Sequence, residues 1–140
     1  HNMPEVKLTR DAMENLLCCP IDNTFKLIGK KFTIHILRNM MMQGQTRFNE
    51  FLESIEGINP KTLSARLREM EENNLIERKV FTDTSPVRVE YNLTEKGLRI
   101  RSILEQMAAF SLHYCCKDIL KDGKPLTLKQ TMNVSPTVLK

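Results

Sequence analysis

The side chains best suited to chemistry lie between Ile58 and Val80, where basic and small residues precede a run of acids. If this segment is helical, Lys61, Ser64, Ala65 and Arg68 share one face, and Thr62 flanks them. Small residues let a helix approach another molecule closely, and lysine or arginine can donate to phosphates or guanine edges. The pattern therefore indicates a DNA-contacting face, with a mixed-charge solvated surface as the alternative.

The order of charges along this helix favours the first interpretation. Lys61, Arg66 and Arg68 precede every acid of the helix, which carries Glu69, Glu71 and Glu72 at its end. Recognition helices insert their N-terminal half into the major groove, and the helix dipole favours phosphate at that same end. This order would point the basic side chains toward DNA and the acidic side chains away from it.

Local sequence signals define this charged helix and the shorter helix that precedes it. Asn59 is a good N-cap followed by Pro60 at the first helical position, and Leu63, Leu67 and Met70 form an apolar stripe. The preceding segment 46–57 has apolar residues at helical spacing and closes at a glycine. Arg47, at the start of that shorter helix, is predicted to contact phosphate.

Two β-rich runs follow, residues 75–81 and 87–93, and the turn cluster Thr-Asp-Thr-Ser-Pro separates them. Two helices joined by a glycine-containing turn and followed by a hairpin make a winged helix-turn-helix. The predicted fold class is therefore mainly α with a small β-hairpin wing. Arg88 lies beside the turn, with Arg78 and Lys79 on the incoming strand, and we expect the wing to contact DNA through Arg88.

Helical patterns also flank this unit. The sequence predicts an amphipathic helix over 4–18 that Pro20 interrupts, helices over 20–29 and 30–44, and a long apolar helix from Thr94 to Leu120. The residues from about Asp122 onward show weak periodicity, so the structure of this tail is left open. His35 lies within an apolar helix and is predicted to be a packed core or interface residue.

Composition narrows the class of protein. The chain of 140 residues fits one domain, and its net charge of +4 mildly favours a polyanionic partner. No apolar run is long enough to span a membrane and no signal-peptide pattern is present, so a cytoplasmic protein is expected. No glycine-rich phosphate loop, nucleophile elbow or paired catalytic carboxylate stands out, so we expect no enzyme and no cofactor.

Several motifs in one order resemble the HxlR-type winged helix-turn-helix regulators, relatives of the MarR group. They are "CPIDNTFKLIGKKFTIHIL", "RFNEF", "GINPKTLSARLREMEENNLIER" and "VRVEYNLTEKG". The chain departs from the family pattern at Phe32 (usually Trp), Asn59 (Ser or Thr), Asn74 (Gly) and Val87 (Pro). Asparagine still caps a helix and still tolerates the left-handed conformation, so these departures are compatible with the fold.

The resemblance implies a homodimeric transcription regulator that binds a near-palindromic site on double-stranded DNA. The resemblance runs from about Cys19 to Leu104. We expect one domain over 3–121, in which dimerisation helices at both ends flank the winged helix, and a tail over 122–140. The DNA-binding residues we expect are Lys61, Thr62, Ser64, Ala65, Arg68, Arg88 and Arg47. A winged helix that binds another protein instead of DNA is the alternative.

The cysteines occur as two adjacent pairs, Cys18-Cys19 and Cys115-Cys116. Cys19 aligns with the family's Cys-Pro cysteine, which in some members senses oxidants or electrophiles, and Cys115 or Cys116 could resolve it across a dimer interface. A small buried apolar residue is the other interpretation of Cys19. Adjacent cysteines lack the C-x₂-C spacing of a zinc chelate, so we expect no metal.

Overall fold

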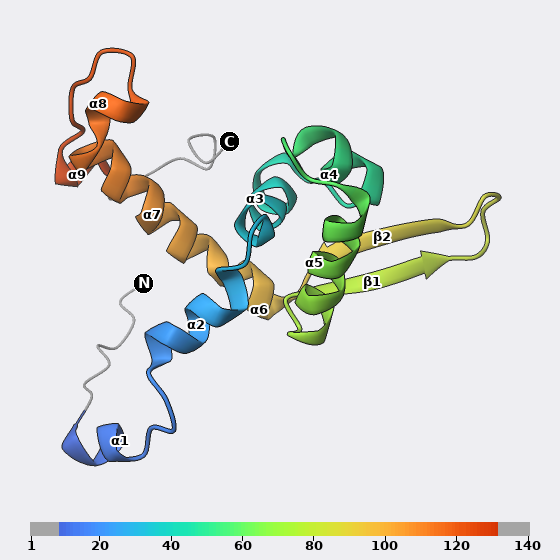
Figure 1. Cartoon of the computed structure of the whole chain (residues 1–140), viewed down its shortest axis with the longest axis horizontal. Coiled ribbons are helices and arrows are strands. Elements are labelled where there is room, and N and C mark those ends of the chain that lie inside the picture. Colours follow the sequence, from blue (N-terminus) through green and yellow to red (C-terminus); the bar gives the residue numbers. More distant parts are fainter. Residues whose placement is uncertain (1–8, 132–140) are drawn as a thin grey trace.

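The computed structural model describes residues 9–131 (Figure 1). The elements are α1 (Arg10–Glu14), α2 (Pro20–Ile28), α3 (Thr33–Gln43), α4 (Phe48–Ser54), α5 (Pro60–Glu72), β1 (Ile76–Phe81), β2 (Arg88–Leu93), α6 (Glu95–Leu98), α7 (Ile100–Tyr114), α8 (Cys116–Ile119) and α9 (Leu128–Thr131). Helices α3, α4 and α5 pack together, and the β1–β2 hairpin projects from them on one side. Helices α1 and α2 and the outer part of α7 extend on the other side. This is the predicted winged helix-turn-helix.

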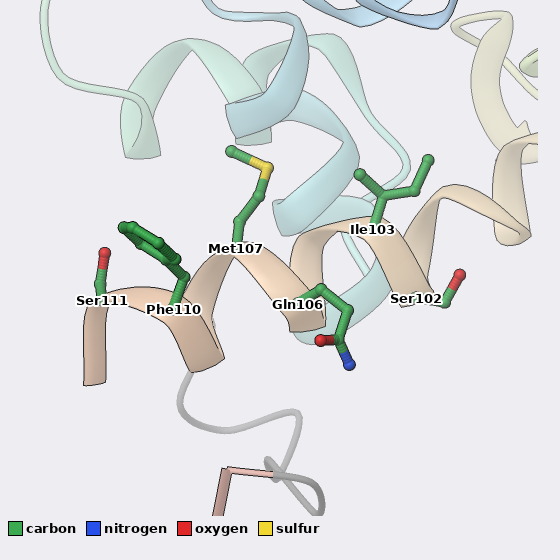
Figure 2. A pocket seen from close by; sticks show the side chains of 6 residues that line it. All are labelled: Ser102, Ile103, Gln106, Met107, Phe110 and Ser111. Carbon is green, nitrogen blue, oxygen red and sulfur yellow. The ribbon is translucent and has the colours of Figure 1, made fainter. Parts of the chain in front are cut away.

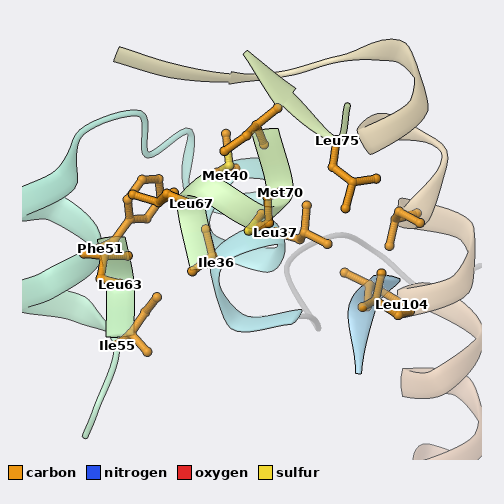
Figure 3. Packing of buried hydrophobic residues seen from close by; sticks show 13 residues of the cluster. Ile36, Leu37, Met40, Phe51, Ile55, Leu63, Leu67, Met70, Leu75 and Leu104 are labelled. Atoms are coloured by element: carbon orange, nitrogen blue, oxygen red, sulfur yellow. The ribbon is translucent and has the colours of Figure 1, made fainter. Parts of the chain in front are cut away.

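One hydrophobic core holds the winged helix together (Figure 3). Leu63, Leu67 and Met70 of α5 are at most 2% exposed, which confirms the predicted apolar stripe. They pack with Phe51 of α4 and Leu37 of α3, among other buried residues. Because these side chains fill one side of α5, its opposite side must face outward.

The hairpin is antiparallel, and its register pairs Ile76 with Leu93 at the base and Phe81 with Arg88 near the turn. Each strand begins one residue later than the sequence predicted. Asn74 precedes β1 with φ of 58°, the left-handed conformation expected of the asparagine that replaces the family's glycine. The Tyr91 N–H donates to the Thr46 carbonyl at 2.7 Å, which attaches the loop before α4 to the hairpin.

A buried polar network fixes the end of α3 against α4. Asn39 is 1% exposed, and its amide Nδ2 donates to Gln45 Oε1 and Ser54 Oγ at 3.1 and 3.0 Å. Arg38 Nε donates to Asn39 Oδ1 at 3.1 Å. Because the buried amide has its partners, it costs little to bury and holds the turn between the helices in one geometry.

The prediction of one long helix from Thr94 to Leu120 is wrong in detail, because the chain makes a short helix on either side of α7. Thr94 caps α6, as expected, by accepting from the Gly97 N–H at 3.0 Å. At the other end, Cys115 leaves the helical conformation with φ −117° and ψ 27°. The Leu126 N–H donates to the Leu112 carbonyl at 3.1 Å, so a residue of the tail satisfies an acceptor that the helix end leaves open.

The tail, whose structure the sequence left open, folds back onto α7. The His113 Nδ1 contacts the Leu126 carbonyl, and since a carbonyl can only accept, Nδ1 carries the proton. Helix α9 then packs along α7 and ends at the buried Thr131. Residues 132–140 lie outside the described residues.

The predicted N-terminal helix is much shorter where the structure describes it. Thr9 caps α1 by accepting from the Ala12 N–H at 3.2 Å, and the helix ends at Glu14. The apolar Met13, Leu16 and Leu17 that follow the helical pattern are exposed, so in this chain no core stabilises a longer helix. The first residues of the predicted helix lie outside the described range. Within residues 9–131, no helix is long and apolar enough to cross a bilayer.

Candidate nucleic-acid interface

Helix α5 presents the predicted contact face. Asn59 Oδ1 accepts from the Thr62 N–H at 2.8 Å and Pro60 occupies the first turn, so the helix begins where the sequence predicted. With the apolar stripe buried, Lys61, Ser64 and Arg68 are exposed. Thr62 and Ala65 are half-buried and flank them. The structure therefore brings all five predicted residues to the outward part of one helix.

Arg66, which the charge order grouped with the contacting bases, does not belong to this face. Its side chain is only 19% exposed, and its Nε donates to the Lys31 carbonyl at 2.8 Å. Its Nη1 lies 3.3 Å from Glu69 Oε1. The Arg66 guanidinium is therefore bound to the turn between α2 and α3.

Arg47 is exposed where α4 begins. The N–H groups of Thr46 and Arg47 both donate to Glu50 Oε1, at 3.1 and 2.9 Å, so this carboxylate satisfies free donors at the helix start. Within the described part of the chain, the Arg47 side chain has no ion-pair partner. It can therefore reach a phosphate without first breaking an ion pair.

Arg88, the predicted contact of the wing, is held by the hairpin itself. Its guanidinium carbon lies 4.4 Å from the centre of the Phe81 ring across the strands. Its Nε lies 3.8 Å from Glu90 Oε2 and is buried without a hydrogen bond. The side chain is 39% exposed, so it would have to turn out of this packing to reach DNA fully.

The sequence predicts Arg78 on the incoming strand but does not identify it as a DNA contact. It is exposed on β1 and lines a hollow of about 220 Å³ between the hairpin and α5, together with Ser64, Leu67, Arg68, Glu71 and Tyr91. The alternation of side chains along a strand could have placed Arg78 on this side of the hairpin, because residues two apart share a face and Ile76 is buried.

The cysteines differ strongly in accessibility. Cys18 and Cys19 are exposed, Cys115 is half-buried and Cys116 is 8% exposed. Cys19 is the N-cap residue of α2, directly before Pro20. All four thiols are free, and within residues 9–131 no three metal-ligating side chains come together. The structure thus leaves Cys19 available for reaction in this chain, and the interpretation of Cys19 as a buried apolar residue is wrong.

His35 was predicted to be a packed core or interface residue, and the structure excludes the core alternative. It lies beside the buried stripe of α3 and is exposed, with its ring centre 6.0 Å from that of Phe32. Partial burial, and then the nearby Arg38 guanidinium, hold the pKa of His35 below its ordinary value. The imidazole is therefore mostly neutral at pH 7 and adds little positive charge.

An apolar surface runs over α2 and α7. Ile21 and Phe25 are 79% and 69% exposed, and Met107 and Phe110 are 49% and 61% exposed. A hollow of about 450 Å³ lies between the two helices, and one of about 650 Å³ lies along α7. Figure 2 shows Ile103 and Met107 projecting to the same side of α7 in the second hollow.

The comparisons with known proteins agree with this geometry. The HxlR-like helix-turn-helix family model matches residues 27–118, which include the winged helix and α7. The HTH-type transcriptional regulator YodB of Bacillus subtilis (strain 168) is 38% identical over 103 residues, or 74% of this chain and 90% of YodB.

The chain belongs to the HxlR-like helix-turn-helix family. Solved structures of related regulators share the fold. The redox regulator HypR in its reduced form is 34% identical, with a TM-score of 0.62 over 74% of this chain and 99% of HypR. A MarR-family regulator from Enterococcus faecalis V583 is 29% identical, with a TM-score of 0.60 over 69% of this chain and 90% of that one. This HxlR-like protein is therefore a transcriptional regulator and not an enzyme.

Proposed function

We propose that this HxlR-like regulator binds a specific sequence of double-stranded DNA as a homodimer. The observation that carries the proposal is the outward face of α5, where Lys61, Ser64 and Arg68 are exposed. Helix α5 itself lies beside the hairpin (Figure 1). Neither cation has an ion-pair partner in the described part of the chain, so both are free to donate to phosphates or base edges. Arg47 and Arg88 extend the contact to either side of the helix.

The apolar surface of α2 and α7 supports the dimer. Large side chains such as Phe25 and Phe110 are exposed there in one chain, and contiguous apolar patches of this kind mark interaction sites. A second copy of the chain would cover both helices at once. Two α5 helices related by a two-fold axis would then read half-sites about 34 Å apart, on a near-palindromic operator.

Oxidation of Cys19 is the regulatory input that we propose for the same protein. The thiol is exposed where α2 begins, and the related HypR is a redox regulator. An oxidant would take two electrons and two protons from Cys19 and a second thiol to form a disulfide. Cys115 of a second copy is the better partner, because Cys116 is buried.

A mobility-shift experiment tests the proposed DNA binding. The purified full chain is titrated into the DNA directly upstream of its own gene, and into unrelated DNA of equal length. We expect binding to the upstream fragment at a concentration at least tenfold lower than to the unrelated one. Equal affinity for both fragments would contradict sequence-specific binding, and a protein-interaction role for the winged helix would then be favoured.

A further inference from the structure

The hollow between α5 and the hairpin is the feature that the contact face does not explain. Ser64, Leu67, Arg68 and Glu71 line it from the helix, and Arg78 and Tyr91 line it from the two strands. Arg78 and Tyr91 are direct partners in the strand register, so they enter the hollow side by side. Leu67 is 2% exposed and closes the floor. The rim is therefore polar and carries two guanidinium groups.

These two guanidinium groups differ from those of Arg66 and Arg88 in the same winged helix. Arg66 is held by Glu69 and the Lys31 carbonyl, and Arg88 is held by Phe81 and Glu90. Among the described residues, neither Arg68 nor Arg78 has a carboxylate within ion-pair distance, although Glu71 lines the same hollow. Two unpaired guanidinium groups at one hollow repel each other, and a bound anion would relieve this repulsion.

We propose that this hollow binds one phosphodiester group of the DNA backbone, held by Arg68 and Arg78. The planar guanidinium matches the oxygens of a phosphate and can donate to them in pairs. The Ser64 hydroxyl, one turn before Arg68, supplies a further donor. This site rests on the proposed DNA binding and adds Arg78 to it. It also makes Arg68 a backbone contact that sets the position of α5, not a reader of base edges.

Replacing Glu71 tests the proposal through a change in DNA affinity opposite to the change expected for the arginine variants. Its carboxylate lines the same hollow and repels a phosphate placed there. Glu71→Gln removes that charge and keeps the shape of the side chain. If phosphate enters the hollow, this variant binds DNA more tightly than the unmodified protein, whereas Arg68→Gln and Arg78→Gln bind it more weakly.

The experiment measures fluorescence anisotropy of labelled duplexes with the full chain, over a series of salt concentrations. Arg78→Gln should weaken binding by the same factor on the upstream fragment and on unrelated DNA. It should also reduce the steepness of log K against log salt by about one per occupied site. Lys117→Gln removes the same charge from an exposed position on α8, far from the hairpin, and is the matched control.

Three results would overturn the phosphate site while leaving the proposed function intact. They are an Arg78→Gln slope and affinity equal to those of Lys117→Gln, a loss confined to the upstream fragment, and no gain from Glu71→Gln. If the unmodified protein binds neither duplex, DNA binding itself is refuted, and the phosphate site with it. Melting curves of each variant establish that the fold is intact, which these exposed positions favour.

Discussion

The ammonium group of Lys30 lies 3.0 Å from the carboxylate oxygen Oε1 of Glu69, which connects the turn after α2 to the last turn of α5. Arg66 contacts the same carboxylate from within α5 and also donates to the Lys31 carbonyl. Glu69 therefore joins α5 to the segment that begins at Cys19. It is held away from the face of Lys61 and Arg68, which leaves that face basic.

Replacing Glu69 by glutamine should remove both ion pairs and lower the free energy of unfolding. Because the Lys30 and Glu69 side chains are 58% and 32% exposed, water screens the pair, and we expect a loss of about 0.5–1 kcal/mol. Urea denaturation followed by circular dichroism measures it. Glu72→Gln, an exposed acid in the same helix, is the control, and an equal effect of both changes would show that the Lys30 contact is not stabilising.

Replacing Gly97 by alanine should be far more damaging than replacing Gly44. A Cβ at Gly97 would lie 2.0 Å from the Leu75 carbonyl oxygen, so α6 would have to move from the base of the hairpin. We expect a loss of roughly 3 kcal/mol. At Gly44 a Cβ has open space but the backbone has φ of +62°, which costs alanine about 1 kcal/mol. Denaturation midpoints that rank the two variants in the opposite order would disprove this account of the α6 junction.

Charge on the apolar surface should dissociate the proposed dimer. Phe25→Asp and Met107→Asp place a carboxylate on exposed positions of α2 and α7, where a second copy would have to bury it. Light scattering should then give the 16.3 kDa mass of one chain, against twice that mass for the unmodified protein. Val87→Asp changes an equally exposed apolar residue in the hairpin turn and should stay dimeric. A monomeric unmodified protein would refute the dimer directly.

Diamide should produce a covalent dimer that depends on Cys19. On non-reducing gels we expect Cys19→Ser and Cys115→Ser to lose the dimer band, because each removes one thiol of the proposed disulfide. Cys18→Ser is the matched control, since Cys18 is also exposed and directly precedes Cys19, and it should keep the band. The absence of any thiol-reversible dimer in the unmodified protein would count against the redox mechanism, as would dependence on Cys18 in place of Cys19.

Local signals predicted the winged helix well. Asn59 and Pro60 define the start of α5, and the spacing of Leu63, Leu67 and Met70 defines its buried side, all within one short segment. Such information lies in neighbouring residues, so sequence alone was enough to orient Lys61, Ser64 and Arg68.

Contacts between distant segments are what the sequence did not reveal. Arg66 and Arg68 are equivalent as charges, and only the Lys31 carbonyl, from another element, removes Arg66 from the exposed face. The break at Cys115 leaves the Leu112 carbonyl open, and its donor comes from Leu126, whose segment has no periodicity of its own. Arg88 looked free beside the turn, but the hairpin register brings it onto the Phe81 ring.

The salt dependence of DNA binding tests the central claim most directly, because phosphate contacts release counterions and other contacts do not. For a dimer in which Arg47, Lys61 and Arg68 of each copy contact phosphate, log K against log salt on the upstream fragment should have a slope of about −5. Lys61→Ala with Arg68→Ala should make that slope clearly shallower. A slope near zero, or one unchanged in the double variant, would contradict the assignment of α5 as the DNA-contacting helix.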